Sequence, residues 1–351
     1  MNSRVIHIDI AKGIGILLVV LGHNWIVTQD GAKGELYEII SSFHMPLFFF
    51  LSGIFFKQDQ KLLPAMLKGA DALLKPYFVT LAMLGIVLII FEGKSPLRYF
   101  IGVAYGTGPM IPWGPLWFLP HLFAIHIFSH LLLNWTQLKE RSVWVKSAVV
   151  TTLLTIGYLL LPVFWQMPLT ILGKQIDLPG LPFSVDILLV TGFYFLLGFL
   201  LRERLIEFEF NLPLFLLALL LFFLIHLQFD YITDLFFRTY DHLVFSTVSA
   251  LLGIYIVLSF SKILSRGAGF SALFSYIGVN TLIILIFHDF LQDKIFTTLR
   301  ALPGPEILYG IVAFLLGVAL PLAISEIIRS NSLLQRCYFP IKSSKQIEQI
   351  Q

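Results

Sequence analysis

Long apolar segments recur along the whole chain and limit what it can fold into. A helix needs roughly 20 mostly apolar residues to cross the hydrocarbon core of a bilayer. Ten segments meet this requirement: 11–29, 37–56, 72–91, 115–135, 143–165, 183–201, 211–229, 241–261, 271–291 and 305–329. Because backbone polar groups cannot stay unpaired in lipid, each segment is expected to be an α-helix. The sequence therefore predicts an all-α polytopic membrane protein with about ten transmembrane helices.

The composition supports this class and excludes two others. Hydrophobic residues make up 57% of the 351 residues, charged residues make up 13%, and the mean hydropathy is +0.85. These values leave too little polar surface for a soluble globule. The apolar runs are also too long for the alternating strands of a lipid-facing barrel. The single cysteine, Cys337, excludes an intramolecular disulfide framework.

The basic residues predict the orientation of the chain. Lys and Arg are more numerous in the termini and even-numbered connections than in the odd-numbered ones, and positive charge stays on the cytoplasmic side. Both termini are therefore expected to be cytoplasmic. No small-residue cleavage pattern follows the first span, which is interpreted as a retained helix. We expect one transmembrane domain over residues 1–340 and a short polar cytoplasmic tail over 341–351, in a multi-pass protein of the cell (inner or plasma) membrane.

The first span carries polar side chains that a purely lipid-facing helix would lack. At about 100° per residue, Lys12 and His23 lie about 20° apart around the helix, and Asp9 lies within about 40° of the same line. About 16 Å along the axis separates Lys12 from His23. Lys12 is thus expected near the cytoplasmic interface and His23 in the outer half. Intramembrane ionisable residues are costly and mark functional pathways.

Three further histidines are predicted to lie in the outer layer with His23. His44 enters the second span from its outer end, and a short connection makes the first two spans antiparallel neighbours. His121 lies near the outer start of the fourth span and His288 near the outer end of the ninth. Ser52, deeper in the second span, permits close helix approach. One buried histidine is more often a packing residue, but four in one layer favour a functional site.

Four sequence segments resemble motifs of a known family. Residues 4–23, "RVIHIDIAKGIGILLVVLGH", and 43–53, "FHMPLFFFLSG", resemble the N-terminal signature of the integral membrane acyltransferase family three, most closely its fucose 4-O-acetylase-like branch. "WFLPHLF" and "GVNTLIILIFHDF" are similar to later motifs of that family. The resemblance implies transfer of an acyl group, usually acetyl, from cytoplasmic acyl-CoA to a hydroxyl of an envelope glycan or lipid-linked sugar. Acetyl-CoA would be the donor substrate, without any permanently bound cofactor.

The family motif of a basic residue, ten residues and a histidine falls on Lys12 and His23. The common pattern has arginine first, and lysine keeps its charge but loses the bidentate fork. We expect Lys12 and Arg4 to attract the anionic donor, with Asp9 paired to one of them. His23 would act as general base on the acceptor hydroxyl, and His44 would orient the acceptor or polarise the thioester carbonyl. Direct attack and an acyl-histidine intermediate both fit the sequence.

The remaining candidate residues have both a functional and a structural interpretation. Predicted to bind the acceptor or support the site are Trp117, His121, His288 and Ser52. An aromatic ring at the outer end of the fourth span can stack on a sugar, but it also suits the membrane interface. Weaker candidates for contact with sugar hydroxyls, all at outer helix ends, are Asp186, Arg238, Asp241 and His242, although helix capping also accounts for Asp241. His126 and His130 are spaced i, i+4 without a third ligand nearby, so no metal site is expected.

A carrier is the alternative function. A transporter or flippase that moves a glycan or lipid-linked precursor would also place polar residues along a membrane pathway. Against it, the polar residues concentrate in the first two spans, and no pair of broken spans recurs in two halves. Dependence on acyl-CoA discriminates the two functions. The expected partners are acyl-CoA, a glycan or lipid-linked sugar and membrane lipid, and not nucleic acid.

Overall fold

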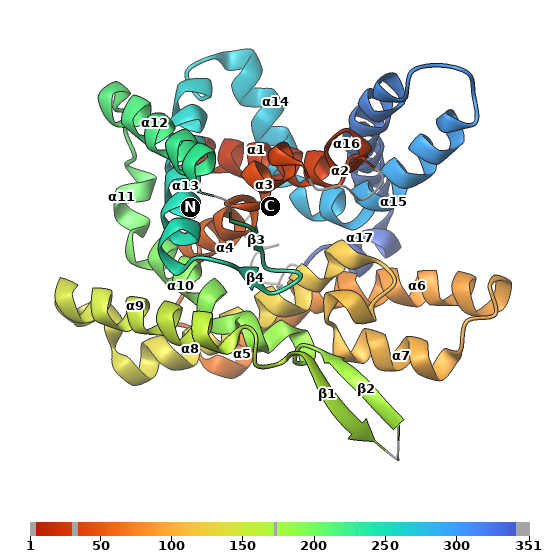
Figure 1. Ribbon diagram of the computed structural model, residues 1–351, viewed down its shortest axis with the longest axis horizontal. Helices are drawn as coiled ribbons and strands as arrows, with labels where there is room; N and C mark the ends of the chain where they lie inside the picture. The colour runs from red at the N-terminus through yellow and green to blue at the C-terminus, as the bar shows by residue number, and fades with distance from the viewer. Residues whose placement is uncertain (1–4, 30–33, 172–173, 230, 342–351) are drawn as a thin grey trace.

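The computed structural model describes residues 5–29, 34–171, 174–229 and 231–341, and most of them are helical (Figure 1). The helices are α1 (Ile6–Gly22), α2 (Trp25–Thr28), α3 (Glu35–Ser41), α4 (His44–Ile54), α5 (Leu62–Gly69), α6 (Lys75–Phe91), α7 (Pro96–Tyr105), α8 (Phe118–Thr136), α9 (Val143–Leu160), α10 (Leu188–Leu200), α11 (Arg202–Ile206), α12 (Leu212–Gln228), α13 (Leu243–Leu264), α14 (Ala268–Val279), α15 (Thr281–Arg300), α16 (Glu306–Ser330) and α17 (Ser332–Tyr338). Two short hairpins complete the fold, β1 (Trp165–Ile171) with β2 (Lys174–Pro179), and β3 (Thr233–Asp234) with β4 (Thr239–Tyr240).

Several of these helices can cross a membrane. Within the described residues, seven are long and apolar enough: Glu35–Ile54, Leu62–Phe91, Gly114–Thr136, Val143–Leu160, Pro182–Leu200, Leu243–Leu264 and Glu306–Ser330. The pair α14–α15, bent by 78°, makes an eighth if it counts as one span. The other two predicted spans correspond to α1–α2 and α12, and both α1 and α12 are 17 residues long. The all-α polytopic fold is confirmed, whereas the count of ten and the cytoplasmic termini stay predictions.

Helix α1 lies at the centre of the helical assembly, in contact with α4, α13, α14 and α15 (Figure 1). Glycines allow the closest of these approaches. An added Cβ at Gly13 would meet the backbone of α14, and one at Gly278 would meet the backbone of α1. Gly53 of α4 and Gly198 of α10 meet the facing backbone in the same way. Small residues at such contacts are how membrane helices pack without a hydrophobic driving force between them.

The two hairpins depart from the predicted helical pattern. The fifth predicted span extends to residue 165, but α9 ends at Leu160 and Trp165 begins β1. Pro162 explains the difference, because proline lacks the N–H that a helix interior requires and disfavours helical backbone at the residue before it. The β1–β2 hairpin pairs Met167 with Leu178 and projects from one edge of the molecule (Figure 1). The β3–β4 hairpin is shorter and lies over the helices.

Candidate functional site

One face of α1 lines two adjoining cavities. Lys12, Ile16 and Val19 line the first, about 360 Å³ in volume and called here the Lys12 cavity. Val19, Gly22 and His23 line the second, about 300 Å³ and called the His23 cavity. The steps from Lys12 to Ile16, Val19 and His23 are four, three and four residues, and such steps stay on one face of a helix. The prediction that Lys12 and His23 lie on one face is therefore confirmed.

Helix α4 supplies a facing wall to both cavities. Met45 lines both of them, Phe48 and Ser52 line the Lys12 cavity, and His44 lines the His23 cavity. Since Val19 of α1 also lines both, the two cavities adjoin at the side chains of Val19 and Met45. The cavities follow α1 and α4 lengthwise, with a lysine at one end and two histidines at the other.

An ion pair lies on the wall of the Lys12 cavity. Nζ of Lys12 lies 3.6 Å from Oδ1 of Asp9 and 4.5 Å from the ring centroid of Phe55. This contact is one of the two pairings predicted for Asp9. The hydroxyl of Ser52 donates to the carbonyl oxygen of Phe48 at 2.7 Å. Arg4, the other residue predicted to bind the donor, lies outside the described residues.

A further basic cavity lies next to the Lys12 cavity. Its volume is about 230 Å³, and Lys57 and Lys68 line it together with Phe55 and His126. Leu73 lines both this cavity and the Lys12 cavity. An anionic group near Lys57 and Lys68 would therefore lie close to the Lys12 cavity.

His23 is the C-cap residue of α1 and stands beside a carboxylate that sequence reasoning missed. Nδ1 of His23 lies 3.6 Å from Oδ1 of Asp289, and the two side chains are 41% and 37% exposed. The His23 ring also packs edge-on against His288, with ring centroids 5.2 Å apart. With Nδ1 beside Asp289, Nε2 is the nitrogen left to exchange a proton. At 3.6 Å the carboxylate lies beyond hydrogen-bond distance of Nδ1, so it acts on the ring through its charge.

The ring nitrogens of His44 and His288 have assignable roles. Nδ1 of His44 lies 2.8 Å from the carbonyl oxygen of Ile40, and Nδ1 of His288 lies 2.9 Å from that of Ile284. A carbonyl oxygen only accepts, so each neutral ring carries its proton on Nδ1 and has an unprotonated Nε2. Nε2 of His288 is buried without a hydrogen-bond partner in the described part of the chain. His44 and His23 line one cavity, as their predicted depth implied.

His121 has a different environment from the other three histidines. It is buried, with Nδ1 3.0 Å from the carbonyl oxygen of Phe183 and Nε2 2.9 Å from Oγ1 of Thr191. Both ring nitrogens thus connect α8 to α10 and to the turn before it. The ring of Trp117, 5.5 Å away, lines the His23 cavity, whereas His121 does not. The structure brings Trp117 to the site and places His121 next to it.

The β3–β4 hairpin forms another wall of the His23 cavity. Asp234, Phe236 and Phe237 all line it. Asp234 accepts the hydroxyl of Tyr37 at 2.7 Å and the backbone N–H of Phe236 at 3.1 Å. Sequence reasoning missed these residues, because two-residue strands are too short to show an alternating pattern.

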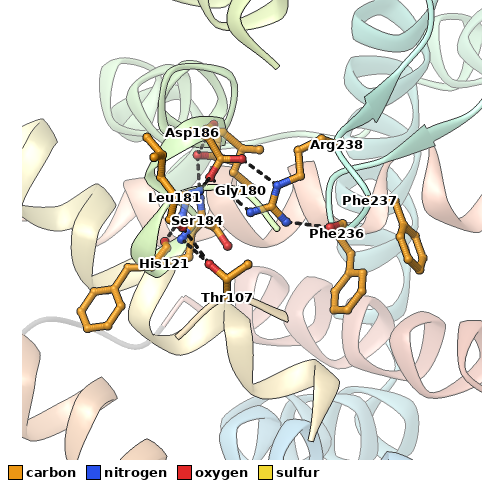
Figure 2. Close-up of polar contacts among 12 residues, drawn as sticks. Thr107, His121, Gly180, Leu181, Ser184, Asp186, Phe236, Phe237 and Arg238 are labelled. Carbon is orange, nitrogen blue, oxygen red and sulfur yellow. Dashed lines mark hydrogen bonds and ion pairs between the residues drawn. The ribbon is translucent and has the colours of Figure 1, made fainter. Parts of the chain in front are cut away.

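Asp186 and Arg238 pair with each other. Nε of Arg238 donates to Oδ2 of Asp186 at 2.7 Å and Nη2 to Oδ1 at 3.2 Å, and both side chains are 0% exposed (Figure 2). Neither residue lines the His23 cavity. Two of the four weaker candidates for sugar contact are therefore partners in a buried ion pair, and Asp241 and His242 do not line the His23 cavity either.

Most of the chain matches one known domain. Residues 5–326 match the family model of an acyltransferase domain, acyltransferase family 3. The chain belongs to acyltransferase family 3. No curated protein and no solved structure shows significant similarity to it. Family membership makes the protein a membrane acyltransferase and does not favour the transporter alternative.

Proposed function

We propose that this acyltransferase moves an acetyl group from cytoplasmic acetyl-CoA to a hydroxyl of an envelope glycan or lipid-linked sugar. The observation that carries the proposal is that the Lys12 and His23 cavities adjoin each other along α1 and α4, with Val19 and Met45 lining both. Similarity of the N-terminal segment to the fucose 4-O-acetylase-like branch supports a sugar hydroxyl as the acceptor. The protein would act in the cell membrane, with donor and acceptor on opposite sides.

The donor would enter at the Lys12 end. Lys57 and Lys68 attract the phosphates of the nucleotide, and Lys12 adds positive charge further along the path. The pantetheine arm is long and narrow, and the Lys12 cavity offers an apolar space for it between Ile16 and Phe48. This route delivers the thioester to the place where the two cavities adjoin.

The chemistry would take place at His23. Nε2 of His23 accepts the proton of the acceptor hydroxyl while the hydroxyl oxygen attacks the thioester carbonyl carbon. A C–O bond forms, the C–S bond breaks, and the CoA thiolate takes the proton back from the imidazolium. Asp289 stabilises that imidazolium, since its carboxylate lies 3.6 Å from Nδ1. The unprotonated Nε2 of His44 accepts a hydrogen bond, which suits orienting the acceptor hydroxyl better than polarising the carbonyl.

Transfer of label from radioactive acetyl-CoA into alkali-labile ester tests the proposal. Membranes with the wild type, His23→Ala or His226→Ala are compared at equal protein levels. His226 lies on α12 and lines neither the Lys12 cavity nor the His23 cavity, so it serves as the matched histidine control. Loss of a general base predicts a fall of about 100-fold or more in His23→Ala, with His226→Ala unchanged.

Two results would contradict the proposal. Equal labelling by His23→Ala and the wild type would remove His23 from the chemistry. No labelling by the wild type, from acetyl-CoA or a longer acyl-CoA and with acceptor present, would remove acyl transfer itself.

A further inference from the structure

The β3–β4 hairpin is tied to the protein by the buried ion pair. Beyond its two contacts with Asp186, Arg238 donates from Nη1 to the carbonyl oxygen of Phe236 at 2.7 Å (Figure 2). Asp186 also accepts the backbone N–H of Leu181 at 2.8 Å. One guanidinium thus connects the turn of the hairpin to the segment before α10. Bidentate geometry of this kind fixes orientation as well as distance.

The backbone around the ion pair is shaped to admit it. Gly180 has φ +88°, and an added Cβ would lie 2.6 Å from Nη2 of Arg238 and 2.9 Å from Oδ2 of Asp186. Phe183, Ser184 and Arg238 have φ values of 55°, 54° and 59°, a region that side-chain-bearing residues rarely adopt. Such strain persists where the surrounding structure holds it, and it clusters at functional sites.

Helix α7 and the turn after it bind the segment before α10, which carries Asp186. Tyr105 donates its hydroxyl to the carbonyl oxygen of Gly180 at 2.5 Å. Thr107 donates to the carbonyl oxygen of Leu181 at 2.7 Å (Figure 2). Burial raises the pKa of Tyr105, so its hydroxyl remains a donor. Helix α7 and the turn after it therefore hold the segment before α10, and that segment holds the hairpin through Asp186 and Arg238.

The hairpin presents aromatic and acidic groups to the His23 cavity. Phe236 packs against Trp117 with ring centroids 6.3 Å apart, and the side chain of Phe237 is 44% exposed. Asp234 and Tyr37 add a carboxylate and a hydroxyl to the same wall. Aromatic faces accept the C–H face of a sugar ring, and oxygen atoms bind its hydroxyls. A cavity of about 300 Å³ has the size of a small-molecule site.

We propose that the β3–β4 hairpin is the acceptor-recognition wall of the site. A pyranose ring lies against Trp117, Phe236 and Phe237, and its reacting hydroxyl faces His23. Arg238 and Asp186 touch no substrate and are positioning residues that hold this wall in place. The inference rests on the proposed acyl transfer and deepens it, because it names a six-membered sugar ring as the acceptor class and the residues that select it.

Acceptor kinetics with purified full-length protein test this assignment. The probes are p-nitrophenyl pyranosides of different sugars, with labelled acetyl-CoA as donor. Phe237→Ala should raise the KM of the best pyranoside about 2- to 12-fold, the range for one aromatic contact, and leave the KM of acetyl-CoA unchanged. Phe260→Ala on α13, 45% exposed, is the matched control and should change neither.

Arg238→Lys tests the positioning role. Lysine keeps the charge but loses the bidentate fork, so the pyranoside KM should rise and kcat should fall while the KM of acetyl-CoA stays constant. Because Arg238 is buried, the substitution can also lower the yield of folded protein, so size-exclusion profiles compare the yield of the variant with that of the wild type. Phe237→Ala changes an exposed side chain and does not depend on that comparison.

The outcomes separate the two proposals. A wild-type pyranoside KM in Phe237→Ala overturns the assignment of the hairpin. Transfer to the endogenous acceptor but to no pyranoside overturns the acceptor class. Absence of any acetyl-CoA-dependent labelling by the wild type is instead the failure of the proposed function.

Discussion

Replacing Asp289 by asparagine tests whether its carboxylate assists His23 in the proposed role of general base. The substitution keeps the shape of the side chain and removes the negative charge that lies 3.6 Å from Nδ1 of His23. That charge matters most when His23 has taken the acceptor proton and become an imidazolium. We therefore expect kcat to fall in Asp289→Asn, with little change in the amount of folded protein.

The size of the effect follows from the distance and the exposure. Coulomb's law gives about 1.2 kcal/mol for unit charges 3.6 Å apart at a dielectric constant of about 80, and about 2.3 kcal/mol at about 40. This water-like range applies because His23 and Asp289 are 41% and 37% exposed, so solvent screens the pair. With a tenfold change in rate for about 1.4 kcal/mol, kcat should fall about 7- to 50-fold.

The assay is the initial rate of transfer of label from acetyl-CoA. His23→Ala sets the lower limit of the scale, and Glu209→Gln is the matched control. The side chain of Glu209 is 74% exposed and pairs with Lys262 at 2.9 Å, and neither residue lines a cavity that His23 or Asp289 lines. A wild-type rate in Asp289→Asn would refute the view that this carboxylate assists His23. An equal fall in Glu209→Gln would indicate a general effect of surface charge.

Three further substitutions test the fold and the site. Asp186→Ala leaves the guanidinium of Arg238 buried without its carboxylate. The free energy of unfolding, measured in mixed detergent micelles, should then fall by about 3–5 kcal/mol. An unchanged value would contradict a desolvated ion pair. Gly53→Ala brings a Cβ against the backbone of α10 and should lower the yield of folded protein in size-exclusion chromatography. Gly269→Ala, at a position with nothing within 4 Å, should not lower it, and equal yields would show that α4 and α10 can separate. His288→Gln removes a ring that packs against the imidazole of His23, the proposed base. The kcat should then fall by up to about 100-fold through misplacement of His23, with the KM of acetyl-CoA constant. An unchanged kcat would limit His288 to packing.

The buried partners of the histidines were beyond sequence reasoning. His121 and His23 were predicted at similar depth, yet both ring nitrogens of His121 bond to Phe183 and Thr191. Of these two histidines, only His23 lines the His23 cavity. Depth along a helix follows from counting residues. Which neighbour meets a given ring depends on the packing of other helices, and no pattern within one helix specifies it.

The sequence by itself determined the class of fold and the polar face of the first helix. Long apolar runs require helices, because lipid offers no partners to backbone groups. The helical period places Lys12 and His23 on one face whatever surrounds them. Both are local properties of a short segment, so neither needs knowledge of the rest of the chain.

Only the tertiary structure decided what those residues meet. The 78° bend between α14 and α15 precedes the helix that brings Asp289 to the end of α1. The hairpin wall depends on Arg238 reaching Asp186, 52 positions away in the chain. A cavity or a buried ion pair arises between elements, and its energy depends on distance and desolvation after they pack. Those quantities exist only once the helices have met.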